Sequence, residues 1–178
     1  KYHLQSEIHN NNGISFIPTM GGLHKGHISL IKKSKKYKLK ILVSIFINPK
    51  QFDKKNDFLS YPKNITKDLK KLKQLKIDYL YMPRFKDIYA FKTKKKIFLD
   101  KVSNQLCGKF RKNHFRGVVD VVNRFIEIIS PKYIFMGKKD YQQLFLVKSF
   151  IEKKYRTKVI GCKTIRNKNK LALSSRNF

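Results

Sequence analysis

Short apolar runs alternate along this chain with longer segments in which apolar residues recur at helical spacing. The runs cover residues 14–18, 40–47, 79–82, 133–136 and 157–162. Strands that alternate with amphipathic helices are typical of βαβ units built on a mostly parallel sheet. The run 40–47 is almost continuously apolar, which indicates a strand buried on both faces. The pattern therefore predicts an α/β fold.

Four segments between and after these runs predict helices. The first begins near Gly26, and the others cover residues 62–76, 117–130 and 141–154. Segment 117–130 is apolar almost all round, which indicates a helix covered by neighbouring elements. Residues 84–101 carry no clear pattern, and the polar tail 171–178 predicts a loop. No internal repeat interrupts this order, and the length of 178 residues predicts a single domain over 1–178.

Composition excludes several classes of protein. Apolar residues make up 41% of the chain and aromatic residues 13%, which excludes a disordered chain. No apolar run reaches the length of a membrane span, so we expect no membrane partner. The two cysteines, Cys107 and Cys162, have no spacing that suits zinc or a disulfide framework. A reducing cytoplasm is the predicted location.

Charge leaves two interpretations open. The chain has 42 Lys and Arg residues against 11 Asp and Glu, a formal net charge of +31. Such a charge is typical of a module that binds nucleic acid or another polyanion. The excess consists of 35 lysines and only 7 arginines, however, and Ile, Asn, Phe and Tyr are also abundant, as expected of A/T-rich codons. We favour this compositional interpretation, and we expect no specific nucleic-acid partner.

Candidate chemistry first appears in the turn that follows the first predicted strand. Residues 20–27 contain three glycines and two histidines, His24 and His27. In open α/β sheets, ligands bind at the carboxyl ends of the strands, and a helix that begins there favours phosphate. Because the histidines are three residues apart, both imidazoles can face the same phosphate oxygens. Alone, this turn predicts an anion site of moderate specificity.

The segment 16–27 closely resembles the opening signature of the pantothenate synthetase (pantoate–β-alanine ligase) family. Five further segments match family blocks in the same order and spacing. They are residues 44–52 (SIFINPKQF), 61–62 (YP), 114–118 (HFRGV), 137–144 (GKKDYQQL) and 171–177 (LALSSRN). The resemblance extends from about residue 14 to the end of the chain, which makes coincidence very improbable.

This resemblance implies a Rossmann-like, doubly wound parallel sheet of the HIGH-motif nucleotidyltransferase type. It also implies the ATP-dependent condensation of pantoate with β-alanine. In that reaction pantoyl adenylate forms first with release of pyrophosphate, and the amine of β-alanine then displaces AMP. ATP and Mg²⁺ are the implied cofactors, pantoate and β-alanine the implied substrates, and a homodimer the implied assembly.

The resemblance also implies a role for individual residues. His24, His27 and Lys139 are the implied catalytic residues, with His27 as the proton donor. The implied nucleotide-binding set is Met20, Gly21, Gly22, Leu23, His24, Lys25, Gly26, His27, Gly137, Lys138, Lys139, Asp140, Ile165, Leu173, Ser174, Ser175 and Arg176. Gln51 and Gln143 match the two residues that hold pantoate, and Asp68 matches an acidic residue associated with Mg²⁺.

Without the resemblance, some of these residues have simpler interpretations. Gln51 and Gln143 would be surface residues. Asp68, alone on a lysine-rich helix, would form a solvated ion pair. Ile165 would be a core residue at the end of a strand, and Lys139 would be one more exposed lysine.

The sequence also departs from the family pattern. Lys138 and Cys107 stand where glutamate is usual, and Asn169–Lys170 replaces a usual Asp-Gly, so a tight turn must form there without glycine. Family members continue into a smaller C-terminal domain, which we expect to be absent after residue 178. Three alternatives therefore stay open: an inactive nucleotide-binding remnant, a related nucleotidyltransferase that adenylates another carboxylate, and a basic nucleic-acid-binding module.

Overall fold

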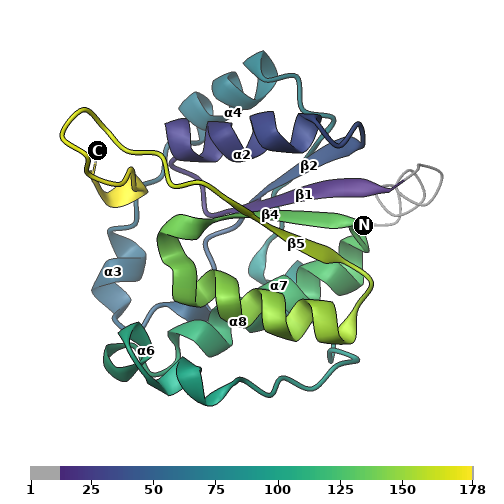
Figure 1. Ribbon diagram of the computed structural model, residues 1–178, viewed down its shortest axis with the longest axis vertical. Coiled ribbons are helices and arrows are strands. Elements are labelled where there is room, and N and C mark those ends of the chain that lie inside the picture. Colours follow the sequence, from purple (N-terminus) through teal and green to yellow (C-terminus); the bar gives the residue numbers. More distant parts are fainter. Residues whose placement is uncertain (1–12, 178) are drawn as a thin grey trace.

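Five parallel strands form one sheet at the centre of the molecule, in the order β3, β2, β1, β4, β5 (Figure 1). The strands are β1 (Ile14–Thr19), β2 (Lys40–Ile45), β3 (Tyr79–Tyr81), β4 (Tyr133–Gly137) and β5 (Lys158–Cys162). The computed structural model describes residues 13–177, so both limits of the predicted domain, and Phe178 at the end of the predicted tail loop, lie outside the described part. All five predicted strands are present, and the predicted α/β class is confirmed.

The strand order places a crevice beside β1. The chain builds the sheet outward from β1 to β2 and β3, and then crosses back to place β4 on the other side of β1. At such a reversal, the connections that leave β1 and β4 run to opposite faces of the sheet, and a crevice forms between their carboxyl ends. The turn 20–27 and the segment 137–140 follow these two strands, so both lie at this edge.

Helices cover both faces of the sheet (Figure 1). They are α2 (Lys25–Lys35), α3 (Lys55–Leu59), α4 (Ile65–Gln74), α5 (Phe85–Tyr89), α6 (Cys107–Phe110), α7 (His114–Ile129) and α8 (Tyr141–Lys154). Phe16 packs in a core with α7 and α8, whereas the next residue, Ile17, packs in a second core with Ile31 of α2 and Leu72 of α4. Successive side chains of a strand point to opposite faces, so the central strands supply both cores. The predicted double winding is therefore present.

Some helices begin at other residues than predicted, because capping side chains and not only the spacing of apolar residues decide where a helix begins. Helix α4 begins at Ile65 and not at Pro62, because the side chain of Asn64 accepts a hydrogen bond from Lys67 N and caps the helix. Helix α7 begins at His114, three residues before the predicted start. The segment 84–101, which had no clear pattern, contains α5.

Several short elements were not predicted at all. They are α3, α6 and the 3₁₀ helices η1 (Pro49–Gln51), η2 (Lys101–Asn104), η3 (Lys138–Asp140) and η4 (Ser175–Asn177). Elements of three to five residues are too short to show a hydrophobic period. The predicted tail loop also contains η4 and a bridge between Arg166 and Ala172. Across residues 13–177, no helix combines the length and apolarity that a membrane span requires.

Candidate active site

A cavity of about 250 Å³ lies at the carboxyl edge of the sheet, between the ends of β1 and β4. Most of the predicted site residues line it. They are Met20, His24, Gly26, His27, Gln51, Gly137, Lys139, Asp140, Gln143, Ile165, Leu173, Ser174, Ser175 and Arg176. Residues that are up to 156 positions apart in the chain therefore face one space. The histidine turn and Lys139 therefore lie on the same rim of the sheet.

Six predicted residues do not line this cavity. They are Gly21, Gly22, Leu23, Lys25, Asp68 and Lys138. Gly21 and Gly22 have φ angles of 83° and 61°, which residues with a side chain rarely adopt, so they shape the turn. Lys138 and Cys107, the two residues that replace usual glutamates, both lie outside the cavity lining.

Helix α4 holds the glycine-rich turn in place through Asp68. This carboxylate is almost fully buried, and its two oxygens accept hydrogen bonds from Gly22 N and Leu23 N, each at 2.8 Å. One helical turn later, the ammonium group of Lys71 donates to the carbonyl of Leu23. The interpretation of Asp68 as a solvated ion pair is therefore wrong, because its partners are backbone groups of the turn.

The association of Asp68 with Mg²⁺ stays a prediction. Both of its oxygens already accept backbone N–H groups, and within residues 13–177 no group of three or more His, Cys, Asp or Glu side chains could hold a metal ion. Mg²⁺ commonly binds through one or two carboxylates together with the phosphates of a nucleotide. The donor set does not fit a magnesium ion held by the protein alone, and it fits better an ion that arrives with a phosphate-bearing ligand.

The backbone of the turn orients both histidine rings. His24 is the N-cap of α2, and its Nδ1 accepts a hydrogen bond from Gly26 N at 3.1 Å. Nδ1 of His27 accepts from His24 N at 3.3 Å, and the two ring centroids are 4.2 Å apart. A nitrogen that accepts carries no proton, so in each neutral ring the proton is on Nε2. The pair is therefore a pair of Nε2–H donors.

Burial, together with the neighbouring His24, Lys139 and Lys71, lowers the pKa of His27 to about 3. Burial also lowers the pKa of His24, again with contributions from Lys139 and Lys71. Both rings are therefore neutral at pH 7 and bind an anion as hydrogen-bond donors. A proton donor at neutral pH needs a pKa near 7, and His27 lacks one in this cavity, because a proton on its ring would be buried among cations. A bound polyphosphate would raise that pKa again.

Lys139 and Asp140 complete the rim at the end of β4. They lie in η3, and Lys139 Nζ is 3.1 Å from Asp140 Oδ1. Lys139 lines the same cavity as the two histidine rings, and its ammonium group lowers the pKa of both. A cation and two N–H donors thus converge on one region of the cavity.

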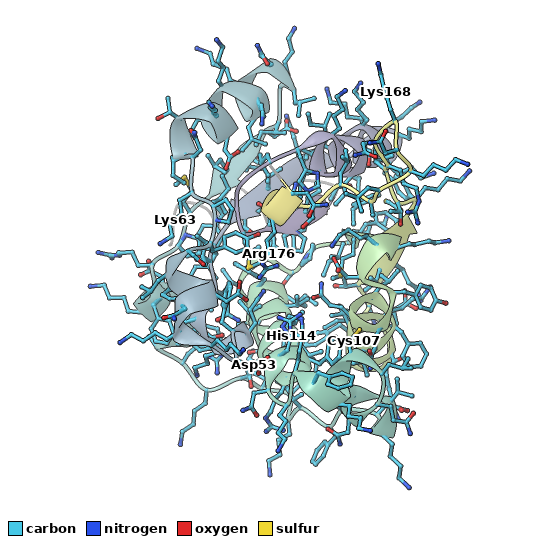
Figure 2. All side chains as sticks on the ribbon, turned by 90° about the vertical axis from the view of Figure 1, so that its left-hand side faces the viewer. Asp53, Lys63, Cys107, His114, Lys168 and Arg176 are labelled. Atoms are coloured by element: carbon cyan, nitrogen blue, oxygen red, sulfur yellow. The ribbon has the colours of Figure 1, made fainter. Side chains whose placement is uncertain are left out.

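The chain returns to the cavity through its tail. Ser175 Oγ donates to the carbonyl of Gly22 at 3.1 Å, so the tail contacts the glycine-rich turn directly. Arg176 forms a two-pronged ion pair with Asp57 of α3, at 3.0 Å to each carboxylate oxygen, and lies over the ring of Tyr61. Figure 2 shows Arg176 on the side of the molecule that also carries His114. Asp57 and Tyr61 hold the tail here.

Gln51 is positioned by the close approach of η1 to α7. A Cβ atom on Gly117 would lie 2.1 Å from the carbonyl oxygen of Lys50, so only glycine permits this contact. Asn48 Nδ2 donates to Gly117 O at 3.1 Å, and Gln51 Nε2 donates to Sδ of Met20 at 2.9 Å. Part of the wall of the same cavity is apolar, formed by Phe46, Val118, Val121, Val122 and Phe125.

Comparison with known proteins agrees with this geometry. The sequence model of the family described as pantoate-beta-alanine ligase matches residues 1–178. The chain therefore belongs to the pantoate–β-alanine ligase family. It is 42% identical to a pantothenate synthetase from Flavobacterium psychrophilum, over 99% of this chain and 64% of that protein. It is 46% identical to one from Buchnera aphidicola subsp. Acyrthosiphon pisum, over 94% of this chain and 60% of that protein.

Solved structures of this family share the fold. A pantoate-beta-alanine ligase from Francisella tularensis, complexed with beta-gamma ATP and beta-alanine, superposes with a TM-score of 0.89 at 40% identity, over 98% of this chain and 70% of that one. A pantothenate synthetase from Thermus thermophilus gives the same TM-score at 31% identity, over 98% of this chain and 64% of that one. The chain thus spans somewhat less than two thirds of the curated relatives named above.

Several residues that line the cavity of this ligase-family chain had no predicted role. They include Thr19, Phe52, Tyr61, Arg111, His114 and Lys163. His114 is buried, and it stands in one of the segments that match the family, so its position in a matching block was the available signal. Lys163 and Arg111 carried no such signal, because exposed cations are abundant in this chain.

Proposed function

We propose that this chain catalyses the ATP-dependent condensation of pantoate with β-alanine through a pantoyl adenylate, with release of AMP and pyrophosphate. One observation carries the proposal. A single cavity holds two Nε2–H donors and Lys139 together with Gln51, Gln143 and an apolar wall. The two N–H donors and Lys139 suit a triphosphate, whereas Gln51, Gln143 and the apolar wall suit a small branched hydroxy acid. The relative from Francisella tularensis, with ATP and beta-alanine named in its complex, supports the same ligands.

The adenylation step follows from these donors. A carboxylate oxygen of pantoate attacks the α-phosphorus of ATP, the new O–P bond forms, and the bond to the bridging oxygen breaks, so that pyrophosphate leaves. Negative charge spreads over the phosphate oxygens during this displacement. His24 and His27 donate hydrogen bonds to these oxygens, and Lys139 supplies a positive charge, without any need to rearrange at the moment of reaction. Mg²⁺ bound with ATP would neutralise further phosphate charge.

The other end of the cavity suits pantoate. Its gem-dimethyl group fits an apolar wall such as that of Val118, Val122 and Phe125. An amide side chain can donate to a carboxylate or hydroxyl oxygen and accept from a hydroxyl group, so Gln51 and Gln143 suit the polar groups of pantoate. Ile165, also on the cavity wall, offers an apolar surface to the adenine ring.

We also infer a homodimer in a reducing cytoplasm. Phe98, Leu106 and Phe110 are 77%, 71% and 82% exposed, and a second copy of the chain could cover such apolar side chains. Cys107 and Cys162 are free thiols, which agrees with a reducing compartment. Light scattering of the purified chain tests the dimer.

A pyrophosphate-release assay with ATP, Mg²⁺ and pantoate tests the function directly. We expect release that depends on pantoate, followed by AMP and pantothenate when β-alanine is added. Release that depends on a different carboxylate would favour the related nucleotidyltransferase, and the absence of any release would favour the nucleotide-binding remnant. Tight binding to any DNA or RNA with a steep dependence on salt would instead favour the basic module.

The variant Gln143→Ala tests the pantoate end alone. Calorimetry should show a much larger loss of affinity for pantoate than for ATP. Gln74→Ala is the matched control, because Gln74 is exposed on α4 and does not line the cavity. An equal loss of both ligands would contradict the role of Gln143.

A further inference from the structure

Arg176 reaches the cavity from the tail, and only one edge of its guanidinium group is held there. Nε lies 3.1 Å from Asp57 Oδ1, and Nη2 lies 3.0 Å from each oxygen of the same carboxylate. The group also lies over the ring of Tyr61, with 5.3 Å between the guanidinium carbon and the ring centroid. Among residues 13–177, Nη1 has no hydrogen-bond partner. Arg176 therefore keeps two free N–H groups.

Asp57 holds this arginine from outside the cavity. Arg176 and Tyr61 both line the cavity, whereas Asp57 does not. Asp57 belongs to α3, which lies below the yellow tail in Figure 1. A carboxylate that faced the cavity would repel a polyphosphate, but one that lies behind the guanidinium group can act only through it.

Contacts between aromatic rings hold α3 in the position that this ion pair requires. None of the five residues of α3 is buried, so the helix is not part of either core. Phe58 of α3 packs edge-on against Phe52, with 5.5 Å between the ring centroids, and Phe52 packs against the buried Tyr61 at 5.7 Å. Asp57 is therefore fixed by the same aromatic cluster on which Arg176 lies.

The backbone that carries Arg176 is held separately from its side chain. Ser175 Oγ donates to the carbonyl of Gly22, and Ser174 Oγ accepts from Arg176 N at 3.3 Å. These bonds fix the tail beside the glycine-rich turn but leave the long side chain of Arg176 free to rotate. A ligand that binds a freely rotating arginine must bear the entropic cost of ordering it. The pair with Asp57 orders the side chain before any ligand arrives.

We propose that Asp57 is a positioning residue for the ATP-dependent step. It holds the edge of Arg176 formed by Nε and Nη2, so that the two N–H groups of Nη1 are presented to a phosphate of the nucleotide. This inference rests on the proposed function, in which ATP occupies the cavity. It concerns the binding of ATP and not the transfer of the acyl group.

The opposite role, in which Asp57 competes with the nucleotide for Arg176, is less consistent with this geometry. A guanidinium group has five N–H donors in a rigid fork, so it can bind anions at two edges at once. Asp57 occupies one edge and leaves the two donors of Nη1 free. The two roles predict opposite signs: removal of the carboxylate weakens ATP binding if Asp57 positions Arg176, and tightens it if Asp57 competes.

Calorimetry with ATP and Mg²⁺ measures this sign. Asp57→Asn keeps the size of the side chain but replaces one acceptor oxygen by a donor, so we expect the Kd for ATP to rise about 10-fold as Arg176 loses its orientation. Asp57→Glu keeps the carboxylate and should recover part of the loss. An unchanged or lower Kd in Asp57→Asn would overturn the inference. A wild-type chain that binds ATP but releases no pyrophosphate would contradict the proposed function and leave this test intact.

A double-mutant cycle shows whether Asp57 acts through Arg176. Arg176→Met removes the guanidinium group and should raise the Kd for ATP about 10- to 100-fold, as expected for the loss of hydrogen bonds to a charged group. When Asp57→Asn is added to that variant, the further change should be less than twofold, since no guanidinium group is left to position. Losses that multiply in the double variant would overturn the positioning role and indicate a separate structural effect of Asp57.

Asp87→Asn is the matched control for charge. Asp87 also pairs with an arginine, Arg84, at 3.3 Å, and neither residue lines the cavity. Both Asp57→Asn and Asp87→Asn remove one negative charge, so their effects on the overall field of the chain are similar. We expect Asp87→Asn to change the Kd for ATP less than twofold. An equal rise of the Kd in both variants would overturn the role of Asp57.

Discussion

The glycine-rich turn and the start of α7 both carry buried or half-buried histidines on the same cavity, yet they present opposite chemistry. In the turn, Nδ1 of His24 and Nδ1 of His27 accept from backbone N–H groups, so the rings offer Nε2–H donors. At the start of α7, Nδ1 of His114 faces a backbone carbonyl, so the ring offers a bare Nε2. The first arrangement suits a polyphosphate, and the second suits a group that donates a hydrogen bond.

The difference shows that the backbone, and not the side chain, decides what a neutral imidazole can do. The start of a helix exposes N–H groups, which turn nearby histidines into donors. A loop carbonyl packed against a helix has the opposite effect. All three histidines have a lowered pKa because of burial, so their tautomers matter more than their charge.

Replacement of His27 removes one of the two Nε2–H donors of the glycine-rich turn. We expect it to have the largest effect on activity. We expect His27→Ala to reduce pyrophosphate release about 1,000-fold, because one preorganised donor to a developing charge contributes 100- to 1,000-fold and the neighbouring ring also loses its support. His27→Gln, which can place an amide N–H near the position of Nε2, should recover part of the loss. Pyrophosphate release close to the wild-type rate in His27→Ala would contradict the assignment, provided that circular dichroism shows a folded chain.

Asp68→Asn should disturb the glycine-rich turn that carries the two histidine donors, without a change to either histidine. The amide leaves one of the N–H groups of Gly22 and Leu23 without an acceptor, so we expect a loss of about 2 kcal/mol in the free energy of unfolding and weaker binding of ATP. Asp78→Asn is a control, since Asp78 accepts a hydrogen bond from Ile41 N but lies away from the cavity. Chemical denaturation and calorimetry measure the two effects. Weaker ATP binding in both variants would contradict a specific role of Asp68.

Acid should destabilise both histidine regions. Each of the three histidines has a lower pKa in the folded chain than the ordinary value of about 6.5 in the unfolded chain, so the unfolded chain binds more protons as the pH falls. Their contribution to stability is complete above pH 6.5 and decreases below it. For His27, with a folded pKa of about 3, we expect a loss of about 1 to 2 kcal/mol between pH 6.5 and pH 5.

Denaturation at both pH values measures this loss, and His27→Gln should reduce the dependence on pH. A melting temperature that is constant from pH 7 to pH 5 would show that the rings are not buried as neutral groups.

The smallest effect is expected in the turn that precedes the tail. Lys170, where the family usually has glycine, has a φ of 61°, a left-handed conformation that is unfavourable for lysine. Lys170→Gly should therefore raise the free energy of unfolding by about 0.5 to 1 kcal/mol. Lys168→Gly, at a nearby position with negative φ, should give no gain. Activity should not change, because neither residue lines the cavity.

The order of elements was predictable because it depends on local periodicity. In the run at β2 and in the apolar segment at α7, the spacing of the apolar residues allows only one kind of element to bury them against the rest of the sheet. The starts of α4 and α7 were not predictable to the residue, since Asn64 competes with Pro62 at the first and polar residues precede the second. The short 3₁₀ helices lacked any period.

The site was partly predictable for a different reason. Motifs that resemble a known family predicted a phosphate site that includes Lys139 and Arg176, and the structure brings both residues to the cavity. The resemblance could not show that Asp57 holds Arg176 or that Asp68 holds the turn, because each contact joins segments far apart in the chain. Arg111 was hidden among 42 cationic residues.

By itself, the sequence determined the α/β class, the strand order along the chain and the residue types that gather at the carboxyl edge. Only the tertiary structure decided the protonation state and the tautomer of those residues. The proton position on each imidazole depends on a backbone partner, and the pKa depends on burial and on cations from other elements. Both are properties of three-dimensional neighbours, which the one-dimensional pattern does not contain.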